Sequence, residues 1–341
     1  MKKKILIRAD GNEKLGIGHI TRCLYFLLEF KDKYNIFFFI KQNKLISDFI
    51  SSHDIKVLEL DPSLSLQEEI DALQNISSDL LILDIRGEND KYYQVYSENF
   101  KKVLMFDDSD KAINVFSTFY LNYNLYTEDI RYNLINKNCE LFLGPSYYIF
   151  NPIFKKYKNF KRNFEKDSFS ILITMGGGDP KSLTVKIIKA IVSLRNVHFN
   201  VILGKLFENF NEIKRLKTEY PSKISLFQNI KNMHDMMAEN DIIITTGGNT
   251  SFEAAFMGIP GILVNQIKIQ NKNGIFYDKQ KIFLNAGLGE DITEEQIRGL
   301  VQKLLSSIEL RRRLSINGRK LFQTEGTKIV LEKFINYNKM Y

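Results

Sequence analysis

Short apolar runs alternate with helix-forming stretches along the whole chain, and this alternation constrains the fold most strongly. In the first half the strand-sized runs lie at Lys4–Arg8, Ile36–Ile40, Lys56–Leu60, Leu80–Leu83, Lys102–Phe106 and Phe119–Asn122. In the second half they lie at Phe169–Thr174, Phe199–Leu203, Ile224–Phe227, Ile242–Thr245 and Gly261–Val264. Between the runs, apolar residues recur at helical spacing. The pattern predicts an α/β protein in which helices cover both faces of parallel sheets.

The chain has 341 residues, which is long enough for two domains. The segment Phe154–Asp167 is rich in lysine and aromatic residues and lacks a clear period, so we interpret it as the linker. We therefore expect a first domain at 1–155, a second domain at 168–325 and a C-terminal helix at 326–341.

Composition narrows the partners. The net charge of +8 suits an anionic ligand, and because the lysines are scattered and no nucleic-acid signature is present, we expect a small molecule and no nucleic acid. The two cysteines, Cys23 and Cys139, form no disulfide or metal framework, which predicts a cytoplasmic protein without a metal site. No apolar stretch reaches the roughly 20 residues of a membrane span. The sequence does not predict the oligomeric state.

A glycine loop, Gly16-Ile17-Gly18-His19, leads from the first predicted strand into a helix. The N-terminal end of a helix exposes unpaired N–H groups and attracts anions. A neutral imidazole at this position can accept a proton from water near neutral pH. Two interpretations remain open: His19 is a catalytic base, or it caps the helix while the glycines only form the turn.

Polar residues end several predicted strands of the first half, namely Asp10, Asp84, Arg86, Asp107, Asp108 and Asn122. Functional residues of parallel sheets lie beyond the carboxyl ends of the strands, so this group favours a site, although each residue alone is typical of a solvated turn. Arg22 lies three residues after His19 on the same helix face. It contacts a diphosphate, orients Asp10 or forms a structural salt bridge.

Two further glycine loops follow strands of the second half. One is Met175-Gly176-Gly177-Gly178-Asp179-Pro180, and the other is Thr245-Thr246-Gly247-Gly248-Asn249-Thr250-Ser251. Glycines let the backbone approach a ligand closely, and N–H groups at a helix start bind phosphate. Neither loop has the Walker lysine or the full dinucleotide fingerprint. Each alone could be a tight turn, but two loops at strand ends of one sheet favour a diphosphate site.

Glu253 follows the last of these loops, near the first turn of the next predicted helix. Its carboxylate either compensates the helix dipole or binds the ribose hydroxyls of a nucleotide. The sequence leaves both roles open.

Three segments in order resemble one protein family: RADGNEKLGIGHITRCL, TMGGGDPKSLT and TTGGNTSFEAAFMGIP. They resemble the UDP-2,4-diacetamido-2,4,6-trideoxy-β-L-altropyranose hydrolases of pseudaminic acid biosynthesis and their spore-coat polysaccharide relatives, which are related to MurG-type glycosyltransferases. The resemblance extends from about Lys4 to about Leu288. It implies a GT-B architecture, in which two Rossmann-like domains with parallel sheets face a cleft and UDP binds mainly to the second. It also implies cleavage of the sugar C1–O bond by water, without a metal or other cofactor.

The resemblance assigns roles to individual residues. His19 matches the catalytic histidine of the family, and Glu253 matches the acid that holds the ribose. Gly176, Gly177, Gly247 and Gly248 fall on the loops around the nucleotide. Our further candidates for substrate binding are Gly16, Gly18, Arg22, Arg86, Gly178, Asn249, Thr250 and Gln270.

The chain departs from the family pattern at three places. Arg86 stands where the hydrolases have a tyrosine, which suggests a different sugar substituent. Asn151 replaces a family arginine. The late Asn-Gln pair of the family corresponds to Ile269-Gln270, to Asn265-Gln266, or to an insertion involving Asn271. These departures concern the identity of the sugar.

The hypothesis from the sequence is hydrolysis of a UDP-linked deoxyamino sugar with inversion at C1. His19 takes a proton from water, Asp10 holds the imidazole, and the glycine-loop amides stabilise the departing UDP. A glycosyltransferase on the same scaffold and a UDP-sugar-binding protein without catalysis are the alternatives.

Overall fold

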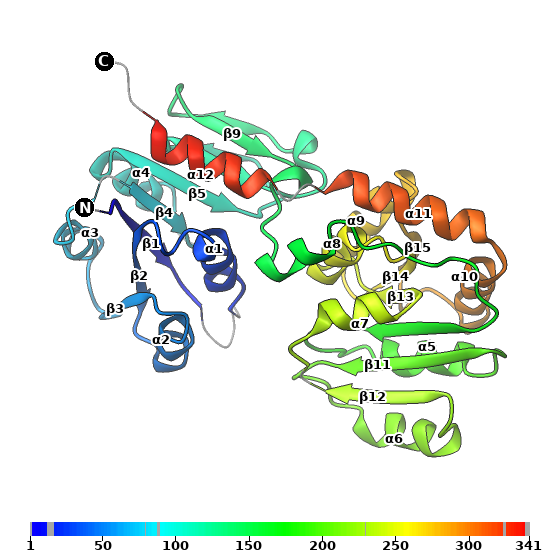
Figure 1. Cartoon of the computed structure of the whole chain (residues 1–341). Helices are drawn as coiled ribbons and strands as arrows, with labels where there is room; N and C mark the ends of the chain where they lie inside the picture. Colours follow the sequence, from blue (N-terminus) through cyan, green and yellow to red (C-terminus); the bar gives the residue numbers. More distant parts are fainter. Residues whose placement is uncertain are drawn as a thin grey trace. The chain divides into compact units, whose positions relative to one another are not determined.

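The computed structural model describes residues 2–11, 17–78, 80–86, 89–228, 230–322 and 325–337. The chain divides into two compact units, Met1–Pro152 with Thr324–Tyr341, and Ile153–Gln323. Both units have an α/β fold, which confirms the predicted fold class (Figure 1).

The first unit contains a parallel sheet in the strand order β3-β2-β1-β4-β5-β7-β9. The strands are β1 (Lys4–Ala9), β2 (Asn35–Lys41), β3 (Lys56–Leu60), β4 (Leu80–Asp84), β5 (Lys102–Asp107), β7 (Phe119–Asn122) and β9 (Glu140–Leu143). The helices are α1 (Gly18–Leu28), α2 (Lys44–Ser51), α3 (Leu66–Gln74) and α4 (Asp90–Asn99). A small parallel pair, β6 (Ile113–Val115) and β8 (Tyr132–Leu134), lies outside the main sheet. Short 3₁₀ turns follow at η1 (Thr127–Asp129) and η2 (Pro145–Tyr147), and a third, η3 (Pro152–Tyr157), leads into the second unit.

Burial explains why β1 and β4 lie at the centre of this sheet. Ile5, Leu6 and Ile7 are fully buried, as are Leu81 and Ile82. A strand whose consecutive side chains are all apolar must bury both faces, which requires helices on both sides of the sheet. Because all these strands are parallel, Asp84 at the end of β4 and the chain after β1 lie at the same edge of the sheet.

The second unit repeats the plan with the strand order β12-β11-β10-β13-β14-β15. Its strands are β10 (Phe169–Thr174), β11 (Val197–Leu203), β12 (Ile224–Gln228), β13 (Ile242–Thr245), β14 (Gly261–Asn265) and β15 (Leu284–Leu288). Its helices are α5 (Leu183–Ile191), α6 (Phe210–Glu219), α7 (Met233–Glu239), α8 (Asn249–Phe256), α9 (Lys268–Lys279), α10 (Glu294–Ser306) and α11 (Ile308–Leu321). The two glycine loops follow the neighbouring strands β10 and β13, so both emerge at the carboxyl edge of the sheet.

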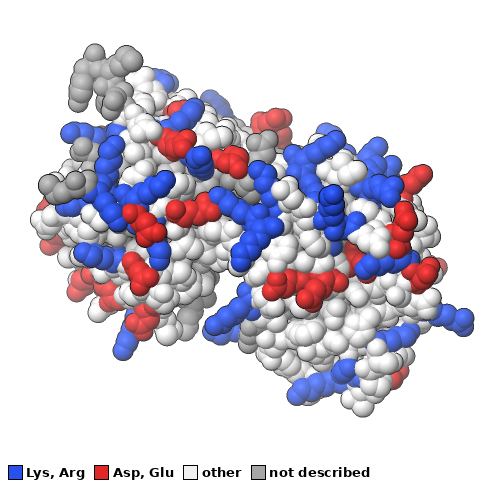
Figure 2. Space-filling view, viewed as in Figure 1, with Lys and Arg blue, Asp and Glu red and all other residues white. Residues whose placement is uncertain are grey.

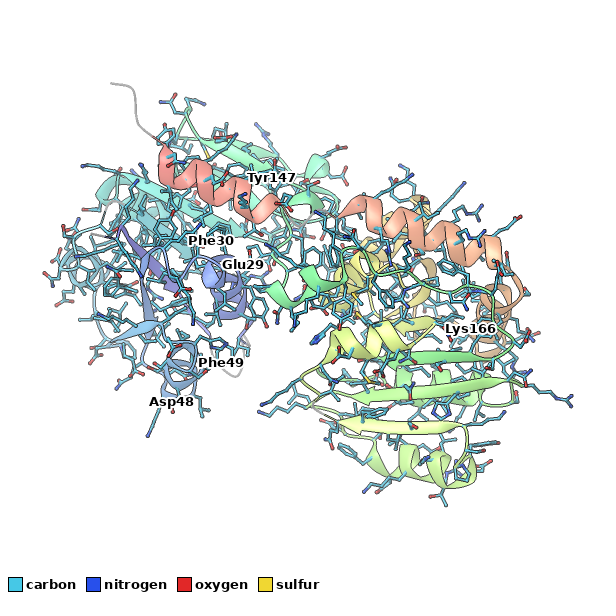
Figure 3. All side chains as sticks on the ribbon, in the orientation of Figure 1. Glu29, Phe30, Asp48, Phe49, Tyr147 and Lys166 are labelled. Carbon is cyan, nitrogen blue, oxygen red and sulfur yellow. The ribbon has the colours of Figure 1, made fainter. Side chains whose placement is uncertain are left out.

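The last helix, α12 (Gly326–Asn336), belongs to the first unit. Phe334 and Tyr337 both pack edge-on against Phe119 of β7, with ring centroids 5.9 and 5.1 Å apart. The helix begins against the backbone of η2, and Figure 3 shows Tyr147 of that turn beside it. The first unit is therefore completed by residues from the far end of the chain.

Charged side chains are distributed over the visible face of both units (Figure 2). Among the described residues, no helix combines the length and apolar character needed to cross a bilayer.

Candidate functional site

His19 lies in the first turn of α1 and is buried, with 7% of its surface exposed. The residue before the helix, Ile17, provides no side-chain cap. The ring Nδ1 lies 2.7 Å from the Asp84 Oδ1 atom, at the end of β4. A carboxylate only accepts and the Arg22 guanidinium only donates, so the two contacts of Nδ1 compete. Because the contact with Asp84 is the shorter, at 2.7 Å against 3.0 Å to Arg22 Nη2, we assign Nδ1 as the donor to Asp84, which leaves the lone pair on Nε2. Among the described residues, Nε2 has no hydrogen-bond partner.

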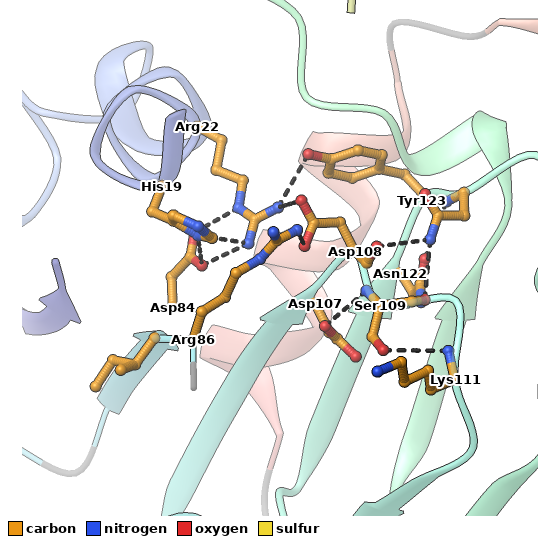
Figure 4. A network of polar contacts seen from close by, with 12 residues as sticks. His19, Arg22, Asp84, Arg86, Asp107, Asp108, Ser109, Lys111, Asn122 and Tyr123 are labelled. Carbon is orange, nitrogen blue, oxygen red and sulfur yellow. Dashed lines mark hydrogen bonds and ion pairs between the residues drawn. The ribbon is translucent and has the colours of Figure 1, made fainter. Parts of the chain in front are cut away.

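Arg22 holds the same carboxylate from the next turn of α1. Its Nε and Nη2 atoms lie 2.5 Å from the two Asp84 oxygens, and Nη2 also lies 3.0 Å from the His19 ring (Figure 4). Asp84 is fully buried. Burial alone would raise its pKa, but the Arg22 guanidinium outweighs burial and holds the pKa of Asp84 below its ordinary value. The carboxylate is therefore ionised at neutral pH.

Arg86, Asp108 and Tyr123 extend this arrangement, which we call the histidine cluster (His19, Arg22, Asp84, Arg86, Asp108 and Tyr123). Asp108 bridges the two arginines, lying 3.2 Å from Arg22 and accepting a hydrogen bond from Arg86. Tyr123 accepts a hydrogen bond from Arg22 at 3.0 Å. The Arg86 side chain is 49% exposed, so it is anchored by Asp108 yet can still meet a ligand.

Asp10 is not the partner of His19, and this part of the sequence hypothesis is wrong. Arg8 donates to Asp10 at 2.8 Å, and Asp10 accepts the backbone N–H of Lys41 at 2.9 Å. Arg8 is itself fully buried and also pairs with Glu69. Asp10 is thus committed to fixing the end of β1 against β2, while Asp84 of the adjacent strand reaches the imidazole.

The glycines of the first loop are only partly described. Gly16 lies outside the described residues. Gly18 is the first residue of α1, and an added Cβ there would meet no atom within 4 Å.

In the second unit, the Met175–Pro180 loop leaves β10 in a glycine-specific conformation. Gly176 has φ +87°, a left-handed value that disfavours other residues. The Gly177 carbonyl accepts the N–H of Leu206 at 2.8 Å, so this loop lies against the end of β11. Asp179 closes the loop by accepting the N–H groups of Leu183 and Thr184 at the start of α5.

The Thr245–Ser251 loop ends in the N-terminus of α8. The N-cap residue is Gly248, which has no side chain to cap the helix, and the Ser251 N–H donates to the Gly248 carbonyl at 2.9 Å. Asn249 is exposed, and Thr250 is half-buried. An added Cβ at Gly247 would lie 2.2 Å from the Gln270 carbonyl oxygen, so glycine is required there. The N-terminus of α8, which the N-cap residue leaves without a side-chain cap, forms a suitable site for an anion.

Asn265 and Gln266 fix both loops, a role that the sequence analysis missed. Asn265 at the end of β14 accepts the Gly247 N–H at 2.8 Å. Gln266 donates to the carbonyls of Met175 and Gly178 at 2.8 and 3.0 Å. Gln270 in turn accepts the Gln266 N–H at 2.9 Å, and its Nε2 lies near Gly248. Of the three readings of the late pair, Asn265-Gln266 braces the loops and Gln270 lies beside them.

Glu253 lies half-buried inside α8. Burial raises the pKa of its carboxyl to about 7. In the described part of the chain, this carboxyl has no hydrogen-bond or ion-pair partner. A carboxyl without internal partners is free to accept hydrogen bonds from a ligand.

Within the described ranges, no group of three or more His, Cys, Asp or Glu side chains is arranged to hold a metal ion. The histidine cluster contains one imidazole and two carboxylates that are both paired with arginine. Its chemistry is that of proton transfer and anion contact.

Comparison with solved structures places the fold in the GT-B class. MurG of Acinetobacter baumannii superposes with a TM-score of 0.71 at 14% identity, covering 98% of this chain and all of that one. The UDP-GlcNAc 2-epimerase of Neisseria meningitidis bound to UDP-GlcNAc gives a TM-score of 0.65 at 14% identity, over 98% and 100% of the two chains. At this identity the likeness concerns the fold alone.

The sequence matches one family model and is similar to two proteins. Residues 170–330 match the family described as Glycosyltransferase family 28 C-terminal domain. The spore coat polysaccharide biosynthesis protein SpsG of Bacillus subtilis is 26% identical over 94% of both chains. The uncharacterized protein MJ1062 of Methanocaldococcus jannaschii is 30% identical over 84% of this chain. The chain spans only 64% of the length of that protein.

Proposed function

We propose that the protein hydrolyses a UDP-linked deoxyamino sugar at C1, releasing UDP and the free sugar for surface polysaccharide or nonulosonic acid synthesis in the cytoplasm. In this proposal the UDP part binds the glycine loops of the second unit, and His19 of the first unit is the general base. The GT-B fold, the family 28 match in residues 170–330 and the similarity to SpsG support a nucleotide-sugar substrate.

The observation that carries the proposal is the contact between His19 and Asp84. Donation from Nδ1 to a buried, ionised carboxylate fixes the ring tautomer and leaves Nε2 as the basic atom. Two bonds from Arg22 keep the carboxylate in place. A histidine that only capped α1 would need none of this support.

The proposed reaction is a single displacement. Nε2 removes a proton from water, the water oxygen forms a bond to C1, and the C1–O bond breaks with its electron pair on the diphosphate. The N–H groups at the start of α8 and the Gly176–Gly178 loop stabilise the negative charge on the departing UDP. Attack opposite the leaving group inverts C1.

Glu253 and Gln270 complete the substrate contacts in this proposal. Glu253 accepts hydrogen bonds from the ribose hydroxyls, consistent with a carboxyl that has no partner among the described residues. Gln270 and Arg86 contact the sugar. An arginine in the position of Arg86 suits a sugar with an acceptor or anionic substituent.

The experiment is phosphorus and proton NMR of the full chain with a panel of UDP-diacetamido-trideoxyhexoses. We expect free sugar and UDP to form without an acceptor, and His19→Ala to slow this by about 10²–10⁴-fold while UDP still binds. Unchanged turnover in this variant would remove His19 from the mechanism.

A glycosyltransferase is the second candidate, favoured by the family 28 match and by the likeness to MurG. In that case a sugar or lipid hydroxyl takes the place of water, and turnover requires an acceptor. A protein that binds UDP-sugars without turnover is the third outcome of the same experiment.

A further inference from the structure

The excess positive charge of the chain is concentrated in two segments. Residues 155–167 and helix α11 together contain eleven Lys and Arg against three Asp and Glu, an excess of eight. This equals the net charge of the whole chain, so the remaining sequence is neutral. The expectation from the sequence that the lysines are scattered is therefore wrong for these two segments.

The two segments lie side by side in the second unit. Arg311 Nη2 donates to the Phe164 carbonyl at 2.7 Å, and Arg312 lies 3.7 Å from the Glu165 carboxylate. Figure 1 shows the chain after η3 running along α11 before it enters β10. In Figure 2, Lys and Arg side chains gather over α11. We call the exposed surface of residues 155–167 and α11 the basic face.

Two arginines of these segments form hydrogen bonds with backbone carbonyls of the second unit. Arg162 donates to the Met237 and Asn240 carbonyls at the end of α7, at 2.6 and 2.7 Å. Arg311 donates to the Leu304 and Leu305 carbonyls at the end of α10. Helix C-termini carry partial negative charge, so these contacts have a structural role.

Most of the other cations of the basic face are exposed. They are Lys155, Lys156, Lys158, Lys161, Lys166, Arg312, Arg313 and Lys320. The exposed acids of the same segments are Glu165, Asp167 and Glu309. Two acids of neighbouring elements contact these segments. Asp235 of α7 accepts a hydrogen bond from the Tyr157 hydroxyl, and Asp241, just before β13, lies 2.5 Å from Lys166. Lys166 lies near the start of β10 (Figure 3). The exposed surface of the two segments thus keeps more cations than acids.

The exposed side of α11 combines this charge with apolar side chains. Ile308, Arg312, Ile316 and Lys320 recur every four residues and therefore share one face of the helix. The isoleucines are 40% and 46% exposed. Isoleucine can enter the headgroup region of a bilayer while neighbouring Arg and Lys bind lipid phosphates.

We propose that the basic face docks on the surface of an anionic lipid bilayer. A polybasic surface is attracted to anionic headgroups, and the two isoleucines add apolar contact. Single-stranded nucleic acid fits less well, because it needs free aromatic rings for base stacking. Here Phe160 lies under the Arg162 guanidinium at 5.2 Å, and the Tyr157 hydroxyl is bonded to Asp235. The proposal does not depend on the reaction that the protein performs.

The test is sedimentation of the full chain with vesicles of phosphatidylglycerol and phosphatidylcholine, compared with phosphatidylcholine alone. We expect binding only to the anionic vesicles, weakening as salt rises from about 0.05 to about 0.5 M. The combined variant Arg312→Glu, Arg313→Glu and Lys320→Glu reverses three charges of α11 and should weaken binding by about 10²-fold or more. Ile308→Ser with Ile316→Ser should weaken binding at both low and high salt, because the lost apolar contact does not depend on ionic strength.

The matched control reverses three exposed lysines elsewhere, with Lys33→Glu, Lys91→Glu and Lys214→Glu. It makes the same change in net charge, but these lysines lie outside the basic face. It should therefore lose far less binding than the α11 variant. Equal losses in the two variants would reduce the effect to net charge and overturn the proposal. So would absence of binding to anionic vesicles at low salt, or tighter binding of a single-stranded oligonucleotide than of vesicles at the same salt. The thermal unfolding midpoint of each variant shows that it is folded.

Discussion

Asp84→Asn is the substitution that tests the histidine cluster in most depth. The change removes the charge that Arg22 binds through two nitrogens and that His19 contacts at 2.7 Å. Removing one partner of a buried ion pair costs about 3–5 kcal/mol. Asp108, 3.2 Å from Arg22, retains part of the compensation, so we expect a loss of about 3 kcal/mol. For a unit of this size, that loss lowers Tm by roughly 6–12 °C.

The same substitution should also slow catalysis. Asparagine can accept through its oxygen or present its NH₂ group to the ring, so it no longer fixes the tautomer of His19. We expect kcat to fall by about 10²–10⁴-fold, measured by NMR at a temperature where the variant is folded. Asp108→Asn is the matched control, because it leaves the contact between His19 and Asp84 intact and removes the ion pairs of a partly exposed carboxylate with Arg22 and Arg86. If Asp84→Asn keeps kcat within about threefold of the natural chain, the assignment of Nε2 as base is refuted.

Three further predictions concern the second unit and the sugar. Gly247→Ala forces a Cβ against the Gln270 carbonyl, so it should lower the free energy of unfolding by about 1–3 kcal/mol and weaken UDP binding. Gly177→Ala places its Cβ in open space and should change the free energy of unfolding by less than about 0.5 kcal/mol. Calorimetry with and without UDP compares the two variants. Burial raises the pKa of Glu253 to about 7 in the folded chain, above its value in the unfolded chain. Between the two pKa values the folded state binds more protons than the unfolded state. The chain therefore loses stability as pH rises from about 5 to 7. Glu253→Gln should remove this part of the pH dependence of thermal unfolding, and an unchanged slope would contradict the burial of the carboxyl. Arg86→Ala, at a half-exposed position, should change stability by less than about 1 kcal/mol yet raise KM for the true substrate, and equal KM values would exclude a sugar contact.

The fold could be predicted where periodicity and burial agree. The central strands β1, β4, β10 and β13 are continuous apolar runs, and their ranges match the structure within a residue or two. β15 (Leu284–Leu288) was not predicted, because its residues are only half-buried and it includes Asn285 and Gly287. Helix α9 was also missed, since its sequence is polar with a glycine in its middle. The return of α12 to the first unit depends on contacts with Phe119 that no local pattern contains.

The site was predicted less completely than the fold. The sequence singled out His19, the two glycine loops and the strand end at Asp84 as candidates, because glycines and polar strand ends leave local signals. It chose Asp10 as the partner of His19, and the parallel order of β1 and β4 instead brings Asp84 to the ring. Choosing between two aspartates at one sheet edge requires the third dimension. Asn265 and Gln266 had a signal, as polar residues after a buried strand, but their bonds to both loops could not be read from spacing.

The most direct test of the account follows the oxygen of water. The full chain is incubated with a UDP-deoxyamino sugar in water enriched in heavy oxygen, without any acceptor, and both products are analysed by mass spectrometry and phosphorus NMR. The account predicts label on C1 of the free sugar, none in UDP, and loss of turnover in His19→Ala. Label in the phosphate of UDP, or turnover only when a sugar or lipid acceptor is added, would contradict it.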